Sequence, residues 1–246
     1  MDAAAIPELR AEASPAGFWD TVSGTQAHPE LWLVLATAGV ALLLVGPWQV
    51  WRITRNSITI AHEGGHGLVA LLTGRTLQGI RLHSDTSGLT VSRGKPTGFG
   101  MILTAAAGYV APSLLGLGGA LLLTGGYVTL LLWGATALLL AMLVMIRNLY
   151  GILTVVLTGA AFLLVSFLTD PEVQAAFAYV VVWFLLFGGV RPVFELQRKR
   201  RRGAAGDSDA DQLARLTRMP PLVWLLVFHA VTLACLFGAG SRLLNV

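Results

Sequence analysis

Apolar residues dominate this chain in long runs, which short polar or basic stretches separate. Wound as a helix, a run of about 20 apolar residues spans the hydrocarbon core of a bilayer. A helix also satisfies its own backbone hydrogen bonds in lipid, which a lone extended segment cannot do. The pattern therefore predicts seven membrane-spanning helices, near residues 31–51, 56–74, 98–123, 127–146, 150–168, 173–191 and 220–240.

One stretch departs from this pattern. Residues 79–92 alternate apolar and polar side chains around a Ser-Asp-Thr-Ser-Gly turn, which is typical of a β-hairpin. We therefore predict an all-α polytopic integral membrane protein of about seven transmembrane helices. The hairpin is a small insertion after the second of these helices.

The chain divides into a tail and one membrane domain. Residues 1–30 are polar and have no apolar segment behind a basic one, so we expect a loosely ordered tail and no cleavable signal peptide. Residues 31–246 form a single membrane-embedded domain, which includes a basic loop at about 192–219. No internal repeat and no soluble second domain is recognisable, and no feature of the sequence indicates an oligomeric state.

Composition supports a bilayer environment. Hydrophobic residues make up 55% of the chain and charged residues only 12%, whereas soluble domains carry about 25% charged residues. The net charge is +4. Because basic residues in membrane proteins set topology, this charge indicates no nucleic-acid partner. The single cysteine, Cys235, excludes an intrachain disulfide.

The distribution of basic residues predicts an orientation. Lys and Arg gather in the cytoplasmic loops of membrane proteins. If the N-terminus is cytoplasmic and all seven segments cross, every one of the 17 basic residues except Arg52, Arg55 and Arg242 lies inside. We therefore expect a multi-pass protein with its N-terminus in the cytoplasm and its C-terminus outside.

The segment near 56–74 is the least apolar of the seven because it carries His62, Glu63 and His66. On a helix, residues four apart share one face, with Cβ atoms about 5–6 Å apart, so both histidines can bind one zinc ion. Glu63 is offset around the helix. Its carboxylate can take a proton from the attacking water and return it to the leaving amine. This pattern is typical of zinc metalloproteases.

The same three residues allow a second interpretation. They can form a polar cluster between helices, or a proton relay in a transporter. A charged side chain at the centre of a membrane helix costs about 2.5–3.5 kcal/mol on insertion scales. Such an expensive cluster favours a functional role, and a metal site gives all three residues one.

Several stretches resemble the site-2 protease family, the M50 metallopeptidases. His62-Glu63-Gly64-Gly65-His66-Gly67 resembles its motif, and residues 107–112, 147–151 and 208–224 resemble a compact bacterial branch, M50B-like. The resemblance implies an intramembrane zinc metalloprotease of the bacterial plasma membrane. Its partners would be the lipid bilayer and membrane-protein substrates, hydrolysed in or near their transmembrane segments. A noncatalytic M50-like scaffold is the alternative that the resemblance leaves open.

The third metal ligand is less clear from the sequence. A catalytic zinc usually has three protein ligands, and the resembling family takes the third from a Leu-Asp-Gly motif, which this chain lacks. Acidic residues are scarce after the histidines. We favour Asp209 as the ligand, with Asp207 second. The alternative is that Ser208 or Asp209 caps a helix that begins near Ala210.

Two further polar residues are candidates for function. Asn148 stands beside Arg147 at a predicted helix boundary. The resemblance implies that Asn148 binds the backbone of an unwound substrate, while a structural hydrogen bond is the alternative. His229 lies inside the last apolar run, where a structural role is the more common one for a lone histidine.

Overall fold

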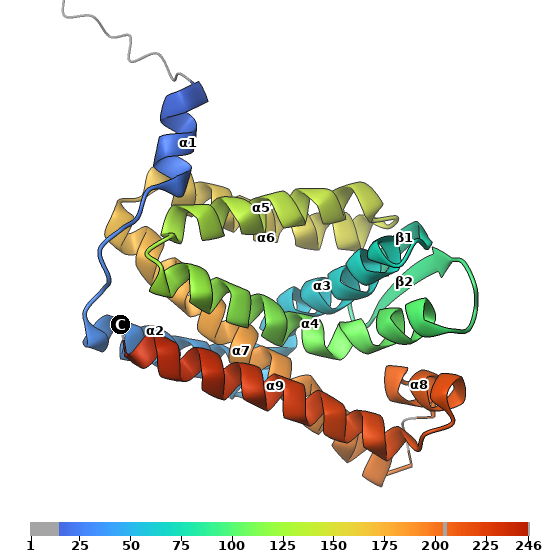
Figure 1. Ribbon diagram of the computed structural model, residues 1–246. Helices are drawn as coiled ribbons and strands as arrows, with labels where there is room; N and C mark the ends of the chain where they lie inside the picture. Colours follow the sequence, from blue (N-terminus) through green and yellow to red (C-terminus); the bar gives the residue numbers. More distant parts are fainter. Residues whose placement is uncertain (1–14, 204–205, 246) are drawn as a thin grey trace, which may run out of the picture.

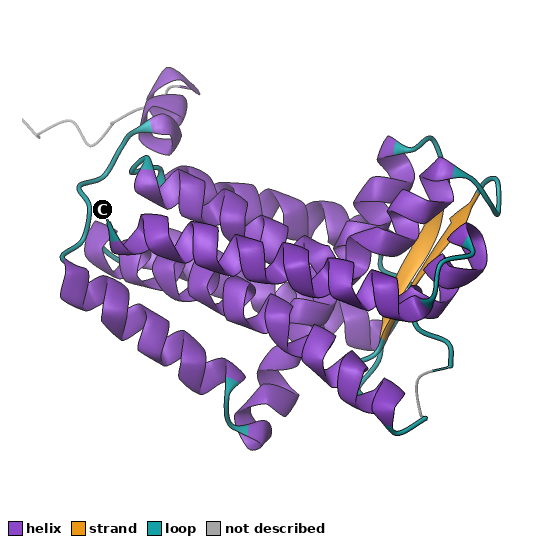
Figure 2. Ribbon diagram, turned by 60° about the horizontal axis from the view of Figure 1, so that its bottom comes forward, coloured by secondary structure: helices purple, strands orange, loops and turns teal. Residues whose placement is uncertain are grey.

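The computed structural model describes residues 15–203 and 206–245, so residues 1–14 of the predicted tail lie outside the described residues. The described chain is a bundle of helices with a small sheet at one end (Figure 1 and Figure 2). This confirms the predicted all-α class with a hairpin insertion. In chain order the elements are α1 (Pro15–Ser23), α2 (Leu31–Val45), α3 (Trp48–Leu72), β1 (Thr76–Leu82), β2 (Gly88–Arg93), α4 (Phe99–Thr124), α5 (Val128–Met145), α6 (Leu149–Leu168), α7 (Pro171–Arg201), α8 (Asp209–Thr217) and α9 (Pro221–Leu244).

Helix α4 lies at the centre of the bundle and contacts α3, α7 and α9. Helices α5 and α6 pair along one side, and α2 lies along α7 (Figure 1). Large side chains such as Trp51, Tyr179 and Phe228 are fully buried between these helices. Short α8 also packs against α4 and α9, so α4 is the element that brings distant segments together.

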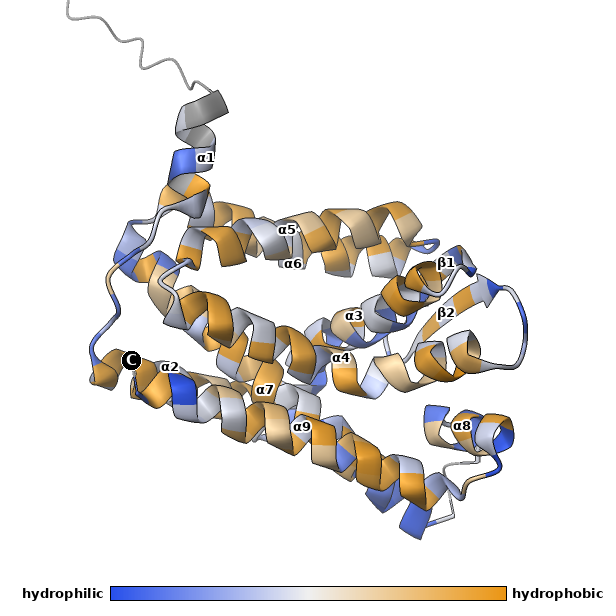
Figure 3. Ribbon diagram, in the orientation of Figure 1, coloured by the Kyte–Doolittle hydropathy of each residue, from blue (hydrophilic) through white to orange (hydrophobic). Residues whose placement is uncertain are grey.

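The outer faces of the helices are suited to lipid. Helices α4, α5, α6, α7 and α9 are each long and apolar enough to cross a membrane, and α2 and α3 together qualify as one bent span. Figure 3 shows that apolar residues continue onto the outer helices. Leu140, Leu157 and Leu168 are 57%, 62% and 74% exposed, which matches an apolar solvent. The chain is therefore a multi-pass membrane protein, with five candidate crossings among the described residues, or six if α2 and α3 count as one span, where the sequence predicted about seven.

Helices α2 and α3 meet at a bend of 100°. Pro47 explains the break, because proline has no N–H to continue α2, and its own backbone is extended, with φ −64° and ψ 133°. Arg191 of α7 donates hydrogen bonds to the carbonyl oxygens of Val45 and Gly46. Its guanidinium also lies over the Trp51 ring, 4.7 Å from the ring centroid. One side chain of α7 thus contacts both arms of the bend.

A buried carboxylate completes this contact. Glu195, one turn after Arg191, is only 8% exposed. Its Oε1 accepts hydrogen bonds from Trp51 Nε1 at 2.9 Å and Arg191 Nε at 3.1 Å. Its Oε2 lies 3.4 Å from an Arg55 guanidinium nitrogen. Because both carboxylate oxygens have partners, Glu195 joins α3 to α7 without leaving an unpaired charge.

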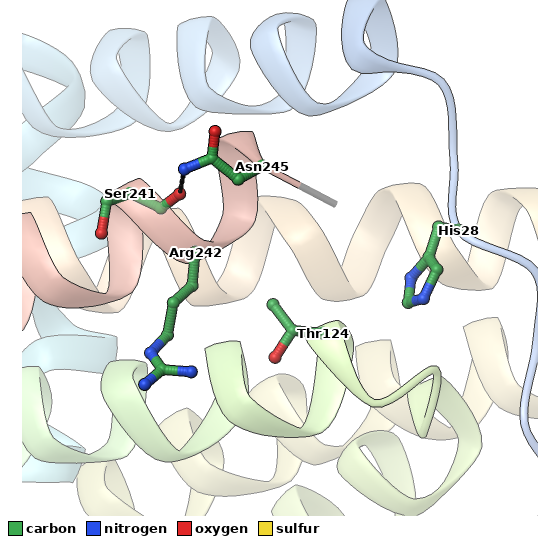
Figure 4. Close-up of a pocket in the computed structure, with 5 residues that line it drawn as sticks. All are labelled: His28, Thr124, Ser241, Arg242 and Asn245. Atoms are coloured by element: carbon green, nitrogen blue, oxygen red, sulfur yellow. Dashed lines mark hydrogen bonds between the residues drawn. The ribbon is translucent and has the colours of Figure 1, made fainter.

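The segment before α2 lies at the same end of the bundle as the end of α9. Gln26 donates its backbone N–H to the carbonyl of Gly126, at the α4–α5 turn, over 2.9 Å. Figure 4 shows His28, Thr124 and Arg242 around one pocket of about 510 Å³. The hairpin and α8 lie at the opposite end (Figure 1). This position of the segment before α2 differs from the predicted chain ends on opposite sides, and counting α2 and α3 as one bent span would account for the difference.

The predicted hairpin is confirmed and begins a little earlier than expected. Strands β1 and β2 pair antiparallel from Thr76↔Arg93 to Leu82↔Gly88, with a register shift between Leu77 and Gly79. The structure adds a third segment that the sequence did not indicate. Residues 146–148 run beside β1, where Ile146 forms a parallel bridge with Ile80. The outer edge of β1 is therefore partly covered.

We predict that Glu195→Ala lowers the free energy of unfolding by roughly 3–5 kcal/mol, because it removes a buried carboxylate and leaves two half-buried arginines without their partner. Thermal unfolding of the detergent-purified protein measures the change. Glu172→Ala, at an exposed position on the same helix, is the matched control. Equal melting temperatures for the two variants would contradict a stabilising role for Glu195.

Candidate metal centre

Small residues let α3 and α4 approach closely around the predicted motif. A Cβ added to Gly65 would lie 2.4 Å from the Cβ of Ala111, so only glycine fits at this crossing. A Cβ added to Gly108 would lie 2.3 Å from His66 Nε2 and 2.6 Å from His62 Nε2. Both ring nitrogens therefore face a position on α4 that has no side chain.

The two histidines are held by α4. His66 Nδ1 lies 2.7 Å from the carbonyl oxygen of Thr104. Because a carbonyl can only accept, Nδ1 carries a proton, and a neutral ring keeps its Nε2 lone pair free. The His62 ring stands edge-on to Tyr109, with centroids 4.9 Å apart. Tyr109 stacks in turn on Phe228 of α9. These contacts fix which nitrogens point to the centre.

Asp209 reaches the same place from outside the spanning helices. Its Oδ2 lies 3.3 Å from Nε2 of His62 and 3.3 Å from Nε2 of His66. Ser208, not Asp209, is the N-cap of α8, so the Asp209 side chain is not used as a cap. Asp207 is exposed and lies 3.3 Å from Arg215. Of the two candidates, the structure brings only Asp209 to the histidines.

The spacing of these atoms suits a metal ion. The two Nε2 atoms are 3.2 Å apart, so with Asp209 Oδ2 they form a nearly equilateral triangle. Ligands of a tetrahedral zinc ion, at bond lengths of about 2.0–2.2 Å, stand about 3.3 Å from one another. Two neutral imidazoles and a carboxylate are also a donor set that zinc accepts, with a fourth position open. The cluster can therefore hold a metal ion.

The charge state of Asp209 fits this role. Burial raises the pKa of its carboxyl, but hydrogen bonds from His62 and His66, together with the charges of these rings when they are protonated, outweigh burial and hold the pKa well below its ordinary value. The group therefore stays ionised at neutral pH. An ionised carboxylate is an anionic ligand and offsets part of the charge of a bound cation.

Glu63 lies under the hairpin. It is 4% exposed, and the Thr90 hydroxyl donates to its Oε2 over 2.7 Å. A Cβ added to Gly88 would lie 2.5 Å from Glu63 Oε1, so the backbone of β2 passes directly over the carboxylate. Thr59 fixes the hairpin tip by donating to the Thr86 carbonyl at 2.9 Å. The structure thus adds Thr90 and Gly88 as neighbours of the predicted base.

Asn148 lies on the hairpin. Its Nδ2 donates to the Leu82 carbonyl over 2.6 Å, and its Oδ1 accepts from the Leu82 N–H over 3.2 Å. The Arg147 N–H donates to the Ile80 carbonyl. The side-chain amide of Asn148, the residue before α6, therefore makes both hydrogen bonds to Leu82 of β1, and this favours the structural alternative. His229 lies against Phe194, with ring centroids 4.5 Å apart, away from the metal centre.

Some neighbours of the site had no usable signal in the sequence. Thr104 acts through its backbone, and Gly108 acts through the absence of a side chain, so neither has a recognisable motif. The spacing Ser208-x-x-Asp211 does match a capping box. It would have placed the helix start at Asp209 and freed that residue to act as a ligand.

A comparison of the sequence with models of known protein families assigns the chain to a family. The family model described as Peptidase M50B-like matches residues 33–239, which is most of the chain. The chain belongs to this family. Membership gives this M50B-like protein a membrane metallopeptidase-like fold and confirms the resemblance carried by the motif at 62–67. Searches of curated proteins and of solved structures found no match.

We predict that Gly108→Ala removes metal binding from this M50B-like protein, because the new methyl group would stand against both Nε2 atoms. Metal content after equilibration with zinc should fall by on the order of tenfold or more. Gly118→Ala on the same helix, where nothing lies within 4 Å of the added Cβ, should bind as the wild type. Full metal content in Gly108→Ala would place the ion elsewhere.

We also predict that Thr90→Val destabilises the protein by about 1–3 kcal/mol, because a buried carboxylate loses its hydroxyl donor without a change in side-chain size. Thermal unfolding checks this. Thr76→Val, at an exposed position of the same hairpin, should leave the melting temperature unchanged. If both variants melt like the wild type, Thr90 does not hold Glu63.

Proposed function

We propose that this M50B-like protein is an intramembrane zinc metalloprotease that cleaves peptide bonds in or near transmembrane segments of membrane proteins. The observation that carries the proposal is the triangle of His62, His66 and Asp209, with Glu63 next to its first member. The alternative function, a proton relay in a transporter, does not require three ligand atoms about 3.3 Å from one another, so this geometry favours a metal site. An intact glutamate beside the ligands favours an enzyme over a scaffold.

The residues divide the chemistry among them. His62, His66 and Asp209 would hold Zn²⁺, which lowers the pKa of water and polarises a substrate carbonyl. Glu63 would take the proton of the attacking water and pass it to the leaving amine. The Thr90 hydroxyl orients the carboxylate, whose oxygens keep further lone pairs for that proton. The hairpin covers Glu63, whereas the side chains of His62, His66 and Asp209 are 22%, 12% and 20% exposed, which leaves water a route to the site.

The hairpin suggests how a substrate would bind. A helical transmembrane segment hides its carbonyl groups, so cleavage requires an extended stretch. Residues 146–148 already cover part of β1. Among the described residues, β2 pairs only with β1, so its outer edge can accept an added strand. Because β2 passes over Glu63, a strand paired there would lie next to the base.

We further propose that the hairpin end of the bundle faces the cytoplasm. The loop at 75–95, Arg147 and the cluster at 198–202 supply basic residues at this end, as the positive-inside tendency requires. The end that holds His28 and Arg242 would then face outward. In a bacterial plasma membrane, water and substrate would therefore reach the site from the cytoplasmic side.

We predict that the detergent-purified wild type holds about one zinc ion per chain, and that Glu63→Gln keeps the zinc but loses proteolysis. Removal of a catalytic base reduces the rate by about 10²–10⁴-fold. Metal analysis and the profile of membrane peptides in cells that express each form are the measurements. Glu172→Gln, at an exposed position, is the control.

The outcomes separate the alternatives. A wild type without zinc would rule out the protease and favour a transporter that uses the His/Glu cluster. Zinc in the wild type with an unchanged peptide profile in Glu63→Gln would indicate a noncatalytic scaffold.

A further inference from the structure

The third ligand of the candidate metal centre is carried by the short helix α8. Asp209 is the first residue of this helix, and the chain reaches it from the last turn of α7 through residues 202–208. His62 and His66, in contrast, lie in the middle of the long helix α3. Metal affinity therefore depends on how firmly α8 is held against the bundle.

Apolar contacts hold one face of α8. Ala210 and Leu213 are fully buried and belong to the same hydrophobic cluster as Val193 of α7 and Phe228 of α9. At the other end of the helix, Trp224 Nε1 donates to the Thr217 hydroxyl over 3.1 Å. These contacts explain why α8 packs on the bundle, and of them only Ala210 lies in the first turn of the helix, next to Asp209.

An ion pair fixes that first turn. An Arg200 guanidinium nitrogen lies 2.7 and 2.8 Å from the two oxygens of Asp211. The same carboxylate accepts from the Ser208 backbone N–H at 3.1 Å and from the Ser208 hydroxyl at 2.6 Å. Asp211 therefore ties α8 to α7 and also closes the capping box at the residue before Asp209.

The electrostatic setting supports a firm contact. The pKa of the Asp211 carboxyl is lowered: burial raises it, while hydrogen bonds from Ser208 and Arg200 outweigh burial. The Arg200 and Asp211 side chains are 25% and 13% exposed, so water screens them only in part. The neighbouring pair Arg215–Asp207 is 61% and 95% exposed, and exposed pairs of this kind contribute little.

We infer that Arg200 and Asp211 are a positioning pair for the metal centre, which sets zinc affinity by holding Asp209 toward His62 and His66. Neither residue is a ligand. This inference rests on the proposed zinc site and adds two residues to it that act through the orientation of α8. Changes to outer groups that orient metal ligands typically weaken metal binding by about 10–100-fold.

The test is zinc affinity, measured by competition with a chromophoric chelator on the detergent-purified full-length chain. Arg200→Gln removes the charge and leaves the capping box intact, and Asp211→Asn keeps the side-chain shape. Both should bind zinc about 10–100-fold more weakly than the wild type. Arg200→Lys, which retains one charge-assisted hydrogen bond, should recover part of the affinity. Arg215→Gln and Asp207→Asn are the matched controls and should bind as the wild type.

A second measurement separates positioning from general stability. Because the buried contacts of Ala210 and Leu213 remain in place, the zinc-free form of Arg200→Gln should melt close to the wild type and well above Glu195→Ala. Wild-type zinc affinity in both Arg200→Gln and Asp211→Asn would overturn the inference. So would a zinc-free melting temperature for Arg200→Gln as low as that of Glu195→Ala. A wild type that binds no zinc would instead overturn the proposed function.

Discussion

The close approach of α3 and α4 is the constraint on which the site depends. Gly65 brings the two backbones together against Ala111, and Gly108 leaves room beside the ring nitrogens of His62 and His66. The same approach allows the Thr104 carbonyl to orient His66. A larger residue at either glycine would separate the helices or fill the centre. The metal site is thus a consequence of helix packing, and small residues serve that purpose in membrane bundles.

Burial of charge in an apolar bundle imposes a second requirement, which this chain meets twice. Glu195 is surrounded by Arg191, Arg55 and Trp51, and Asp209 by two imidazoles. An unpaired charge in the membrane costs several kcal/mol, so each carboxylate needs its partners to remain ionised. The partners differ in consequence. Arginine stays protonated and can only donate hydrogen bonds, so the contacts of Glu195 stabilise the packing of α3 on α7. A neutral imidazole has a free nitrogen lone pair, so His62 and His66 together with Asp209 can bind a cation.

Local patterns carried much of the prediction from sequence. The motif at 62–66, the apolar segments and the hairpin are short-range features. Each is visible in the sequence as a local pattern: a four-residue spacing, a continuous apolar run, and an alternation of apolar and polar residues. The closeness of Asp209 to the two histidines was predictable because acidic residues after the motif are few. The 100° bend between α2 and α3 was not, since each segment looks like a full span and only Pro47 marks the bend. Contacts between distant residues, such as Thr90 with Glu63, leave no periodic trace and required the structure.

The placement of Asp209 on α8 has a consequence that a ligand on a spanning helix would not have. Two ligands on one helix keep their separation whatever the bundle does, so α3 alone offers an incomplete site. The third ligand joins the site only when α8 packs against the bundle. This packing depends in part on the ion pair Arg200–Asp211, which is partly exposed, so water and dissolved ions weaken it. The stability of the third ligand can therefore change without a change in the spanning helices. At the candidate metal centre, metal occupancy would depend on this contact between α8 and α7, because the spanning helices supply only His62 and His66.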